Sequence, residues 1–375
     1  MEWKTAKFSS VAKFSQGQQI PIENQFLEDG INRDRFIRIV DFTSGFRELP
    51  RYVEANPKYH VNNDDVIMIR YGTPGRVFRG ISGIIANNMF KITFNETVIN
   101  KNYGYWFLKQ ESIYNFLMLM NCSATMPAIS FKMLDRVIVQ IPTLSVQHRI
   151  ASILSTYDSL IKTNTKRIRL LEKMAENLYK EWFVRFRFPG HEKVEMENGL
   201  PKGWSRGSLS EICKFKRGKN ITSSEMIEGL VPVISAGLEP SGFHNEANVK
   251  GVSVTMSSSG ANAGYIAIHY SDIWAADCSY IEESTTPYIY YVYELLNNIR
   301  GVISNFQRGA AQPHVYPKDI NRIKMIIPSE DLRCLANERL SVIHKQIHNF
   351  EQQNTLLARQ RDLLLPRLMS GKLEV

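Results

Sequence analysis

The sequence predicts an α+β protein in which two mixed, strand-rich globular regions are joined by two long antiparallel coiled-coil helices, as a pseudo-twofold internal repeat. Three observations predict this fold. Two segments recur along the chain, each copy ends in a long heptad pattern, and short strand-like runs fill the sequence between the recurring segments. The length of 375 residues fits two or three domains, and 43% hydrophobic residues is ordinary for a globular chain.

The repeat has a similar frame and dissimilar middles. Residues 3–20 align without gaps to residues 204–221, at an offset of 201 positions. Residues 124–142 align to residues 310–328 at an offset of 186 positions, and the sequence between the two anchors barely matches. One frame therefore carries two different inserts, which indicates one scaffold that presents two different binding surfaces.

Each copy ends in a predicted helix of roughly 35 residues, about 50 Å long at 1.5 Å per residue. Apolar residues follow alternating steps of four and three, the period of a coiled-coil seam. The seam of the first helix contains Ile150, Leu154, Tyr157, Ile161, Ile168, Leu171 and Leu178. The seam of the second contains Leu340, Ile343, Ile347, Phe350, Leu357 and Leu364. Asn164 and Asn354 interrupt the seams, and Pro366 is expected to end or kink the second helix.

The two helices have two packing alternatives, each on its own globular region or one on the other. Because both seams keep the same register, with one helix per repeat, we expect them to pack on each other. A pseudo-twofold arrangement makes that pair antiparallel.

The predicted organisation has five parts. These are a first globular region at 1–143, a helix at 144–186, a polar linker at 187–203, a second globular region at 204–329, and a second helix with a C-terminal tail at 330–375. Strands are expected at 66–70, 137–142, 251–256, 264–270 and 323–328, and matching helices at 103–120 and 287–303.

The formal net charge of +9 makes a polyanionic partner plausible. No apolar run approaches the ~20 residues of a membrane helix, and the N-terminus lacks the apolar stretch of a signal peptide. The four cysteines are far apart and are interpreted as free thiols in a reducing compartment. We therefore expect a cytoplasmic protein with no membrane partner.

A search for catalytic motifs indicates that the chain is not an enzyme. The glycine-rich run at 257–264 lacks the lysine of a phosphate-binding loop, and no metalloprotease or serine-nucleophile motif is present. The sequence NPKY at 56–59 lacks the second proline of the amino-methyltransferase motif and is interpreted as a turn. We expect no catalytic residue, no metal site and no cofactor in this chain.

The candidate binding residues of the first globular region are mainly arginines, eight of which fall between positions 33 and 79. Arginine suits bidentate contact with guanine and with phosphate. The DNA-binding candidates here are Arg33, Arg35, Arg38, Arg70, Tyr71, Thr73, Arg76 and Arg79. The alternative is solvated charge paired with nearby acidic residues such as Asp34 and Asp41.

The second globular region offers a different set of candidates. The basic run at 214–219 is the clearest phosphate-binding segment, and the small polar run at 257–264 allows close backbone approach. The candidates are Lys214, Lys216, Arg217, Lys219, Ser257, Ser258, Ser259, Asn262, Arg308 and Gln312. For Gln312, pairing with adenine and capping of a turn both stay open.

Together these features resemble the specificity subunit of type I restriction-modification systems. The likeness rests on KFSQGQQI and KFKRGKNI at the start of the copies, on the segments 121–154 and 307–340, and on the ending LLLPRLMSGKLEV. Gly309 and Gln312 fit the family's turn in the second copy, whereas the first copy has Ser123 and Met126. In the second copy, Arg333 stands in place of Gln147.

The resemblance implies a non-catalytic subunit that binds double-stranded DNA. Each globular region would be a target recognition domain for one half of a bipartite, asymmetric sequence, and the paired helices would set the gap between the halves. The helices would also dock two methylation subunits, which bind S-adenosylmethionine and methylate adenine. Restriction subunits, where they join the complex, would bring ATP and Mg²⁺.

Two other function classes compete with this interpretation. One is a structural scaffold whose duplicated domains bind other proteins on a coiled-coil spacer, and steep salt dependence of DNA binding would argue against it. The other is a stand-alone nuclease or methyltransferase, which would need a cofactor or metal site that the sequence does not show.

Overall fold

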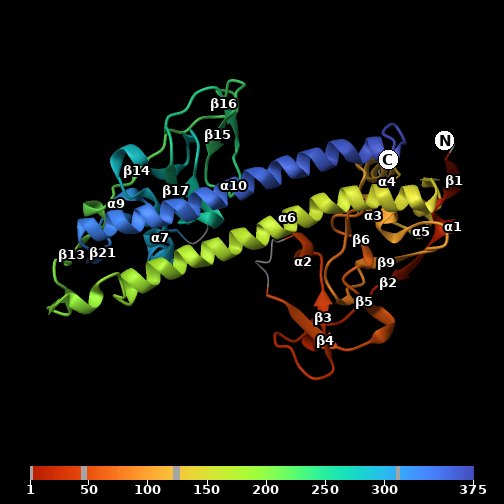
Figure 1. The fold of residues 1–375 in the computed structure, drawn as a ribbon, viewed down its shortest axis with the longest axis horizontal. Coiled ribbons are helices and arrows are strands. Elements are labelled where there is room, and N and C mark those ends of the chain that lie inside the picture. Colours follow the sequence, from red (N-terminus) through yellow and green to blue (C-terminus); the bar gives the residue numbers. More distant parts are fainter. Residues whose placement is uncertain (1–2, 44–48, 121–126, 310–312) are drawn as a thin grey trace. The chain divides into compact units, whose positions relative to one another are not determined.

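The computed structural model describes residues 3–43, 49–120, 127–309 and 313–375 (Figure 1). The chain forms two compact units. Unit 1 comprises Met1–Lys162 and Thr355–Val375, and unit 2 comprises Thr163–Asn354. Each unit thus contains one copy of the repeat together with part of both long helices.

Unit 1 contains ten strands among its described residues. They are β1 (Lys4–Lys7), β2 (Ala12–Gln16), β3 (Arg33–Ile37), β4 (Arg51–Glu54), β5 (His60–Val61), β6 (Val66–Ile69), β7 (Val77–Phe78), β8 (Gly83–Ile85), β9 (Met89–Phe94) and β10 (Ile138–Ile141). Its short helices are α1 (Phe8–Val11), α2 (Val40–Thr43), α3 (Lys101–Lys109), α4 (Glu111–Leu119) and α5 (Phe131–Leu134). The strands form sheets of order β2-β9-β6-β7, β4-β3-β8-β5 and β1-β10.

Unit 2 repeats this topology with another sequence. Its strands are β13 (Ser205–Ser208), β14 (Lys216–Arg217), β15 (Val231–Ile234), β16 (Gly242–His244), β17 (Ser253–Ser257), β18 (Ile266–His269), β19 (Trp274–Ala275), β20 (Cys278–Glu282) and β21 (Lys324–Ile327). Its short helices are α7 (Ile289–Asn298), α8 (Arg300–Ser304) and α9 (Pro317–Ile320). The sheet orders β14-β20-β17-β18, β16-β15-β19 and β13-β21 match those of unit 1, apart from β5. The dissimilar inserts therefore share one fold.

The recurring segments of the sequence pair with each other in space. In unit 1, β1 pairs antiparallel with β10, so that Lys4 lies opposite Ile141. In unit 2, β13 pairs in the same way with β21, so that Ser205 lies opposite Ile327. The entering and leaving ends of each insert are therefore held side by side by main-chain hydrogen bonds.

A glycine recurs at the same position of each frame because a side chain there would collide with a neighbouring carbonyl group. A Cβ atom on Gly17 would lie 2.3 Å from the carbonyl oxygen of Ala86, and one on Gly218 would lie 2.4 Å from that of Ala276. These separations are far below van der Waals contact, so only glycine fits where the frame crosses the next strand connection.

The hydrophobic core of each unit continues onto the long helices α6 (Leu144–Tyr179) and α10 (Glu330–Met369). In unit 1, the start of α6 and the end of α10 share a core that includes Leu154, Leu365 and Leu368. In unit 2, the end of α6 and the start of α10 share a core that includes Ala175 and Leu340. Burial of such apolar side chains supplies most of the stability of a long amphipathic helix.

Specific contacts show that α6 and α10 are antiparallel within each unit. In unit 1, Arg361 donates a hydrogen bond of 2.6 Å to Asp158. In unit 2, Asn164 Nδ2 donates to Gln353 Oε1 over 3.3 Å, and further along the pair the Arg339 guanidinium lies 5.7 Å from the Trp182 ring. The predicted α+β fold with paired antiparallel helices is thus confirmed.

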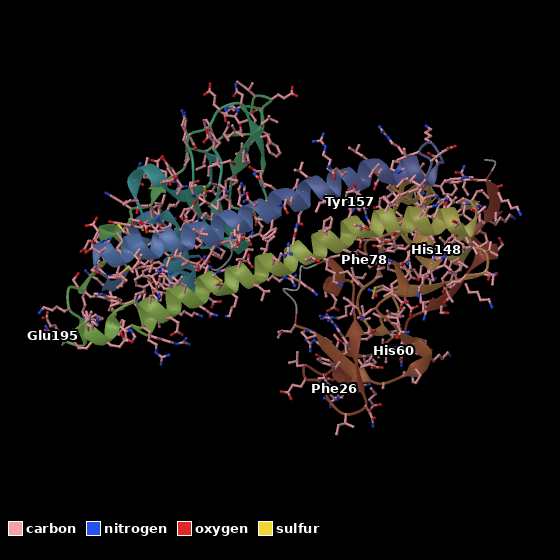
Figure 2. All side chains as sticks on the ribbon, in the orientation of Figure 1. Phe26, His60, Phe78, His148, Tyr157 and Glu195 are labelled. Carbon is pink, nitrogen blue, oxygen red and sulfur yellow. The ribbon has the colours of Figure 1, made fainter. Side chains whose placement is uncertain are left out.

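The predicted seam residues are all buried or half-buried. The fully buried ones are Ile150, Leu154, Leu340, Ile343 and Ile347. The half-buried ones are Tyr157, Ile161, Ile168, Leu171, Leu178, Phe350, Leu357 and Leu364. Figure 2 labels Tyr157 on α6.

Three expectations about individual elements need correction. Helix α10 continues three residues past Pro366, to Met369. The helices expected at 103–120 and 287–303 are each two helices. Gln110 adopts an extended backbone (φ −62°, ψ 133°) between α3 and α4, and Ile299 leaves the helical conformation (φ −95°, ψ 13°) between α7 and α8. The linker at 187–203 contains a small hairpin of β11 (Met196–Glu197) and β12 (Leu200–Pro201).

The five-part organisation stays a prediction, since the compact units divide the chain within both long helices. Within the described residues, no helix combines the length and the apolar character that crossing a membrane requires.

One half-buried histidine links the stability of unit 2 to pH. His269 Nε2 lies 2.8 Å from Thr255 Oγ1, and burial lowers the His269 pKa from 6.5 to about 4. Between these two values the unfolded chain binds a proton that the folded chain does not. His269 therefore leaves the free energy of unfolding unchanged above pH 6.5. It lowers that free energy by about 3 kcal/mol in total as the pH falls to about 4.

We expect the His269→Gln variant, whose amide can still reach Thr255, to lose less stability than the parent chain between pH 7 and pH 4.5. The comparison is made from urea unfolding midpoints at each pH, because all other titrating groups are shared. Equal losses in the two proteins would contradict the assignment.

Candidate nucleic-acid interface

In unit 1, segments that lie far apart in the sequence meet where strand β2 ends. The Gln18 N–H donates to the Ile85 carbonyl over 2.9 Å, and the Arg70 N–H donates to the Asn88 carbonyl over 2.8 Å. Tyr71 forms a bridge to Ala128, in the connection that leads back to the frame. We call this place the first junction, and its polar residues are Gln16, Gln18, Gln19, Arg70, Tyr71, Asn87 and Asn88.

Arg70 is the cation of the first junction. Its guanidinium donates to Gln16 Oε1 and lies 5.0 Å from the centre of the Tyr71 ring. The Arg70 Nε atom and the Asn88 Oδ1 atom are both buried without a hydrogen-bond partner in the described structure. Unpaired buried polar atoms are uncommon in proteins, so this junction has unused hydrogen-bonding capacity.

Side-chain amides make up most of the first junction. Gln16 Nε2 donates to the Asn87 carbonyl over 2.9 Å, and Asn87 Nδ2 donates to Gln19 Oε1 over 3.3 Å. Asn56, which caps the short helix of the NPKY turn, donates to Gln18 Oε1 over 3.4 Å. These amides are not among the candidates predicted from the sequence. The runs QGQQ at 16–19 and NN at 87–88 are the sequence features that could have indicated them.

Unit 2 has a second junction at the same position of the fold. The Val315 N–H donates to the Ser258 carbonyl over 3.0 Å, just as the Ile129 N–H donates to the Arg70 carbonyl over 3.0 Å in unit 1. Ser259 bridges to His314, as Tyr71 bridges to Ala128. The polar residues of the second junction are Arg217, Lys219, Ser258, Ser259, Asp277, Arg308 and His314.

Cations line the second junction where amides line the first. Arg217 follows the recurring phenylalanine at the position of Gln16, and its guanidinium lies 3.8 Å from Asp277 with half of the side chain exposed. Lys219 lies at the position of Gln18, with its ammonium 5.8 Å from the Trp274 ring. Residues of three candidate segments therefore meet here, namely Arg217 and Lys219, Ser258 and Ser259, and Arg308 and His314.

The remaining basic candidates of this segment differ in their surroundings. Lys216 pairs with Glu282 over 2.7 Å, and this hydrogen bond raises the Lys216 pKa. Lys214 is exposed at the start of the segment. Arg308 is exposed and pairs with Asp319 over 3.0 Å. Gln312 lies outside the described residues.

The three candidate serines are buried, and their contact with DNA stays a prediction. Ser257, Ser258 and Ser259 are only 4%, 4% and 7% exposed. The Ser257 hydroxyl donates to the Ala236 carbonyl over 3.0 Å, and the Ser259 hydroxyl donates to Asp277. Their small hydroxyls thus satisfy interior polar groups at the end of β17. Asn262 is half-buried beside them.

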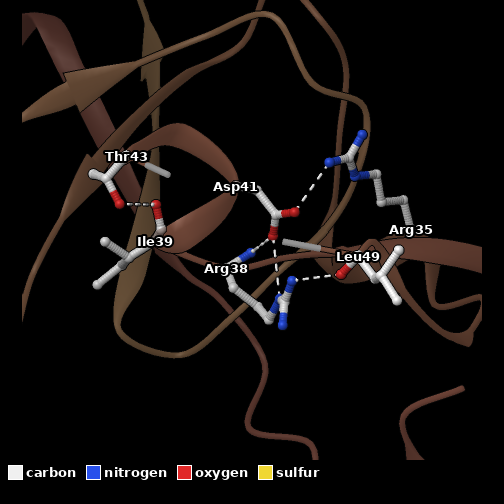
Figure 3. Close-up of polar contacts among 6 residues, drawn as sticks. All are labelled: Arg35, Arg38, Ile39, Asp41, Thr43 and Leu49. Carbon is white, nitrogen blue, oxygen red and sulfur yellow. Dashed lines mark hydrogen bonds and ion pairs between the residues drawn. The ribbon is translucent and has the colours of Figure 1, made fainter. Parts of the chain in front are cut away.

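Arg35 within β3 and Arg38 just after it stabilise a turn. Arg35 and Arg38 both pair with Asp41, which is 5% exposed, over 3.0 and 3.3 Å (Figure 3). Arg38 also donates to the Leu49 carbonyl over 2.9 Å. The alternative of charge pairing therefore describes these two arginines, because a buried carboxylate requires cationic partners.

The side chains of three more arginines contact residues outside the first junction. The Arg33 guanidinium lies 3.6 Å from the ring of Phe26, which Figure 2 shows away from α6. Arg76 packs 3.9 Å from the Tyr114 ring and pairs with Glu111 over 3.7 Å. Arg79 donates to Asn102 over 2.6 Å and lies 4.1 Å from the Tyr105 ring. Thr73 is exposed in the loop before β7, and no contact assigns it a role.

Comparison with known proteins places the chain in a family. Residues 1–173 and 201–361 each match the family described as the type I restriction modification DNA specificity domain. Because the two matches cover most of the chain, the chain belongs to this family. Members are DNA-recognition components without catalytic activity of their own, and this chain is therefore non-catalytic.

Individual relatives agree with this assignment. The chain is similar to the type I restriction enzyme MjaIX specificity subunit of Methanocaldococcus jannaschii, with 26% identity over 321 residues that cover 78% of this chain and 73% of the relative. The MjaVIII specificity subunit of the same organism is 24% identical over 242 residues, covering 60% of this chain and 53% of the relative.

The fold also matches that of a solved structure. The S subunit of a type I restriction-modification system from M. genitalium superimposes with a TM-score of 0.65 at 20% identity, and the match covers 98% of this chain and 96% of the other. Among the residues that the structure describes, no three His, Cys, Asp or Glu side chains are grouped to hold a metal ion.

Proposed function

We propose that this chain is the specificity subunit of a type I restriction-modification complex and recognises a bipartite, asymmetric double-stranded DNA target. The observation that carries the proposal is the junction built twice in one fold with different side chains. The region 1–143 would bind one half-site and the region 204–329 the other. Two different surfaces on two equivalent frames are what a split, asymmetric target requires.

Basic residues that recur in both frames support DNA as the ligand. The exposed pairs are Lys13 with Lys214, Lys132 with Lys318, and Arg136 with Arg322. Within the described residues none of the six makes an ion pair, which leaves them available for phosphate. The DNA backbone is chemically the same at both half-sites, so recurring cations suit phosphate contacts and non-recurring residues suit base contacts.

The long helices have exposed apolar residues that support docking of other subunits. Leu170 of α6 is 71% exposed and Leu356 of α10 is 57% exposed. These leucines occupy equivalent positions of the two copies, 186 residues apart, and lie in different units. Two equivalent sites suit two copies of one partner, and we propose that they dock two methylation subunits, which would supply S-adenosylmethionine. Restriction subunits would bring ATP and Mg²⁺.

The first test maps methylated adenine in cells that co-express the chain with the methylation subunit encoded beside it. We expect a split motif with a fixed gap. Seven residues inserted after Lys162 in α6 and after Asn354 in α10 keep the heptad phase and add about 10 Å of helix. At 3.4 Å per base pair, the gap should lengthen by about three base pairs.

A seven-residue insertion between Asn198 and Gly199, at the tip of the β11–β12 hairpin, is the control and should leave the gap unchanged. A gap that stays the same after the paired helix insertions would contradict the proposal that the helices act as a spacer. A methylation pattern without two halves would contradict the bipartite target.

The arginines of unit 1 allow a second test by salt-dependent DNA binding. We expect Arg70→Ala to weaken binding to a duplex that carries the mapped target and to reduce the slope of log K against log salt by about one, the loss of one phosphate contact. The matched variant Arg79→Ala should keep the parental slope, since Arg79 packs against Asn102 and Tyr105. Identical slopes for the parent and both variants would exclude Arg70 from the DNA surface.

Docking is tested by the stoichiometry of the purified complex. We expect Leu170→Arg and Leu356→Arg each to reduce the complex from two methylation subunits to one, because a charge replaces apolar contact area on one helix. Native mass spectrometry reads the ratio directly. Leu230→Arg, at a loop leucine that is 93% exposed, is the control. If the double variant Leu170→Arg/Leu356→Arg still binds two methylation subunits, the docking sites do not include these leucines.

A further inference from the structure

The two junctions offer different hydrogen-bonding groups at equivalent backbone positions. Gln16 and Gln18 of unit 1 correspond to Arg217 and Lys219 of unit 2, at the frame offset of 201 positions. Both pairs flank the glycine whose missing Cβ lets the strand end lie against the next turn. The backbone is therefore common to the two junctions and the chemistry is not.

The amides of the first junction have the groups that adenine requires. Gln18 and Gln19 each accept one hydrogen bond at Oε1, from Asn56 and Asn87, and these bonds orient the two amide planes. Neither Nε2 atom has a partner in the described structure. An oriented amide with a free N–H and a second oxygen lone pair can pair with the N6 and N7 edge of adenine.

The cations of the second junction have the groups that guanine requires. Half of the Arg217 side chain is exposed, and Asp277 lies on one side of its guanidinium. The Lys219 backbone N–H donates to the Ala275 carbonyl, whereas its exposed ammonium donates no hydrogen bond to another residue in the described structure. Arginine and lysine donate to the O6 and N7 acceptors of guanine, whereas adenine presents a donor at position 6 that repels them.

We propose that the first junction reads an A·T base pair through Gln18 and Gln19, and that the second junction reads a G·C base pair through Arg217 and Lys219. The proposal rests on the proposed function, since it names the base chemistry of the two half-sites. Arg70 then contacts phosphate beside the first junction, because Gln16 and the Tyr71 ring already engage its guanidinium.

The test selects bound sequences from a library of duplexes randomised across both half-sites, using the full chain purified with its methylation subunits. We expect the parent complex to select an adenine in one half and a guanine in the other. The double variant Gln18→Ala/Gln19→Ala should lower the preference for that adenine by about 10-fold or more, and Arg217→Ala should do the same for the guanine. Arg217→Gln should shift the preference in the second half from guanine toward adenine.

Controls separate base reading from general loss of binding. Arg70→Ala should lower affinity for all sequences equally without changing either preference. Gln140→Ala on β10 and Arg206→Ala on β13 remove an exposed amide and an exposed cation from the frame sheets, and both should behave as the parent does. Thermal melting of each variant verifies that it folds.

The outcomes distinguish this proposal from the proposed function. A split motif whose adenine and guanine preferences survive the junction variants would overturn the assignment of readers and leave the function standing. A split motif without adenine in one half or without guanine in the other would do the same. Selection of no sequence at all by the folded parent complex would overturn both.

Discussion

The pairing of the entering and leaving strands of each insert is the constraint on which the rest of the structure depends. Strand β1 lies against β10, and β13 lies against β21, so each insert begins and ends at one place. A long helix starts within three residues of each leaving strand, at Leu144 and Glu330. Its position relative to the frame is therefore fixed whatever the insert contains. This is how one scaffold can tolerate two inserts that barely match in sequence.

The same constraint explains where variation is allowed. The glycines at 17 and 218 recur because a neighbouring carbonyl occupies the space of a side chain. The residues on either side of them differ in chemistry, amide in one copy and cationic in the other. Steric demand fixes the backbone of the junction, and no comparable demand fixes its exposed side chains. A surface of this kind can change specificity without changing fold.

The helix seams could be predicted from sequence because a heptad pattern records which face is buried, as it does for Leu154 and Leu340. The frame could be predicted because its residues recur. The junctions could not, since they combine segments that are adjacent only after folding, and no local pattern shows that Gln16 meets Arg70. The separate roles of the clustered arginines could not be predicted for a related reason. Arginine serves buried carboxylates such as Asp41 as readily as phosphate, and composition does not separate the two uses.

Polar groups within the helix pair act on register more than on stability. In unit 1 Asp158 of α6 pairs with Arg361 of α10, and in unit 2 Asn164 of α6 donates to Gln353 of α10 over 3.3 Å. Burying such pairs has a desolvation cost that an apolar seam avoids, so they contribute little net stability. A slip of one heptad, however, would separate the partners and leave these polar side chains without their hydrogen bonds. If the helices set the gap between two half-sites, the axial register is the quantity that must not vary, and these contacts specify it.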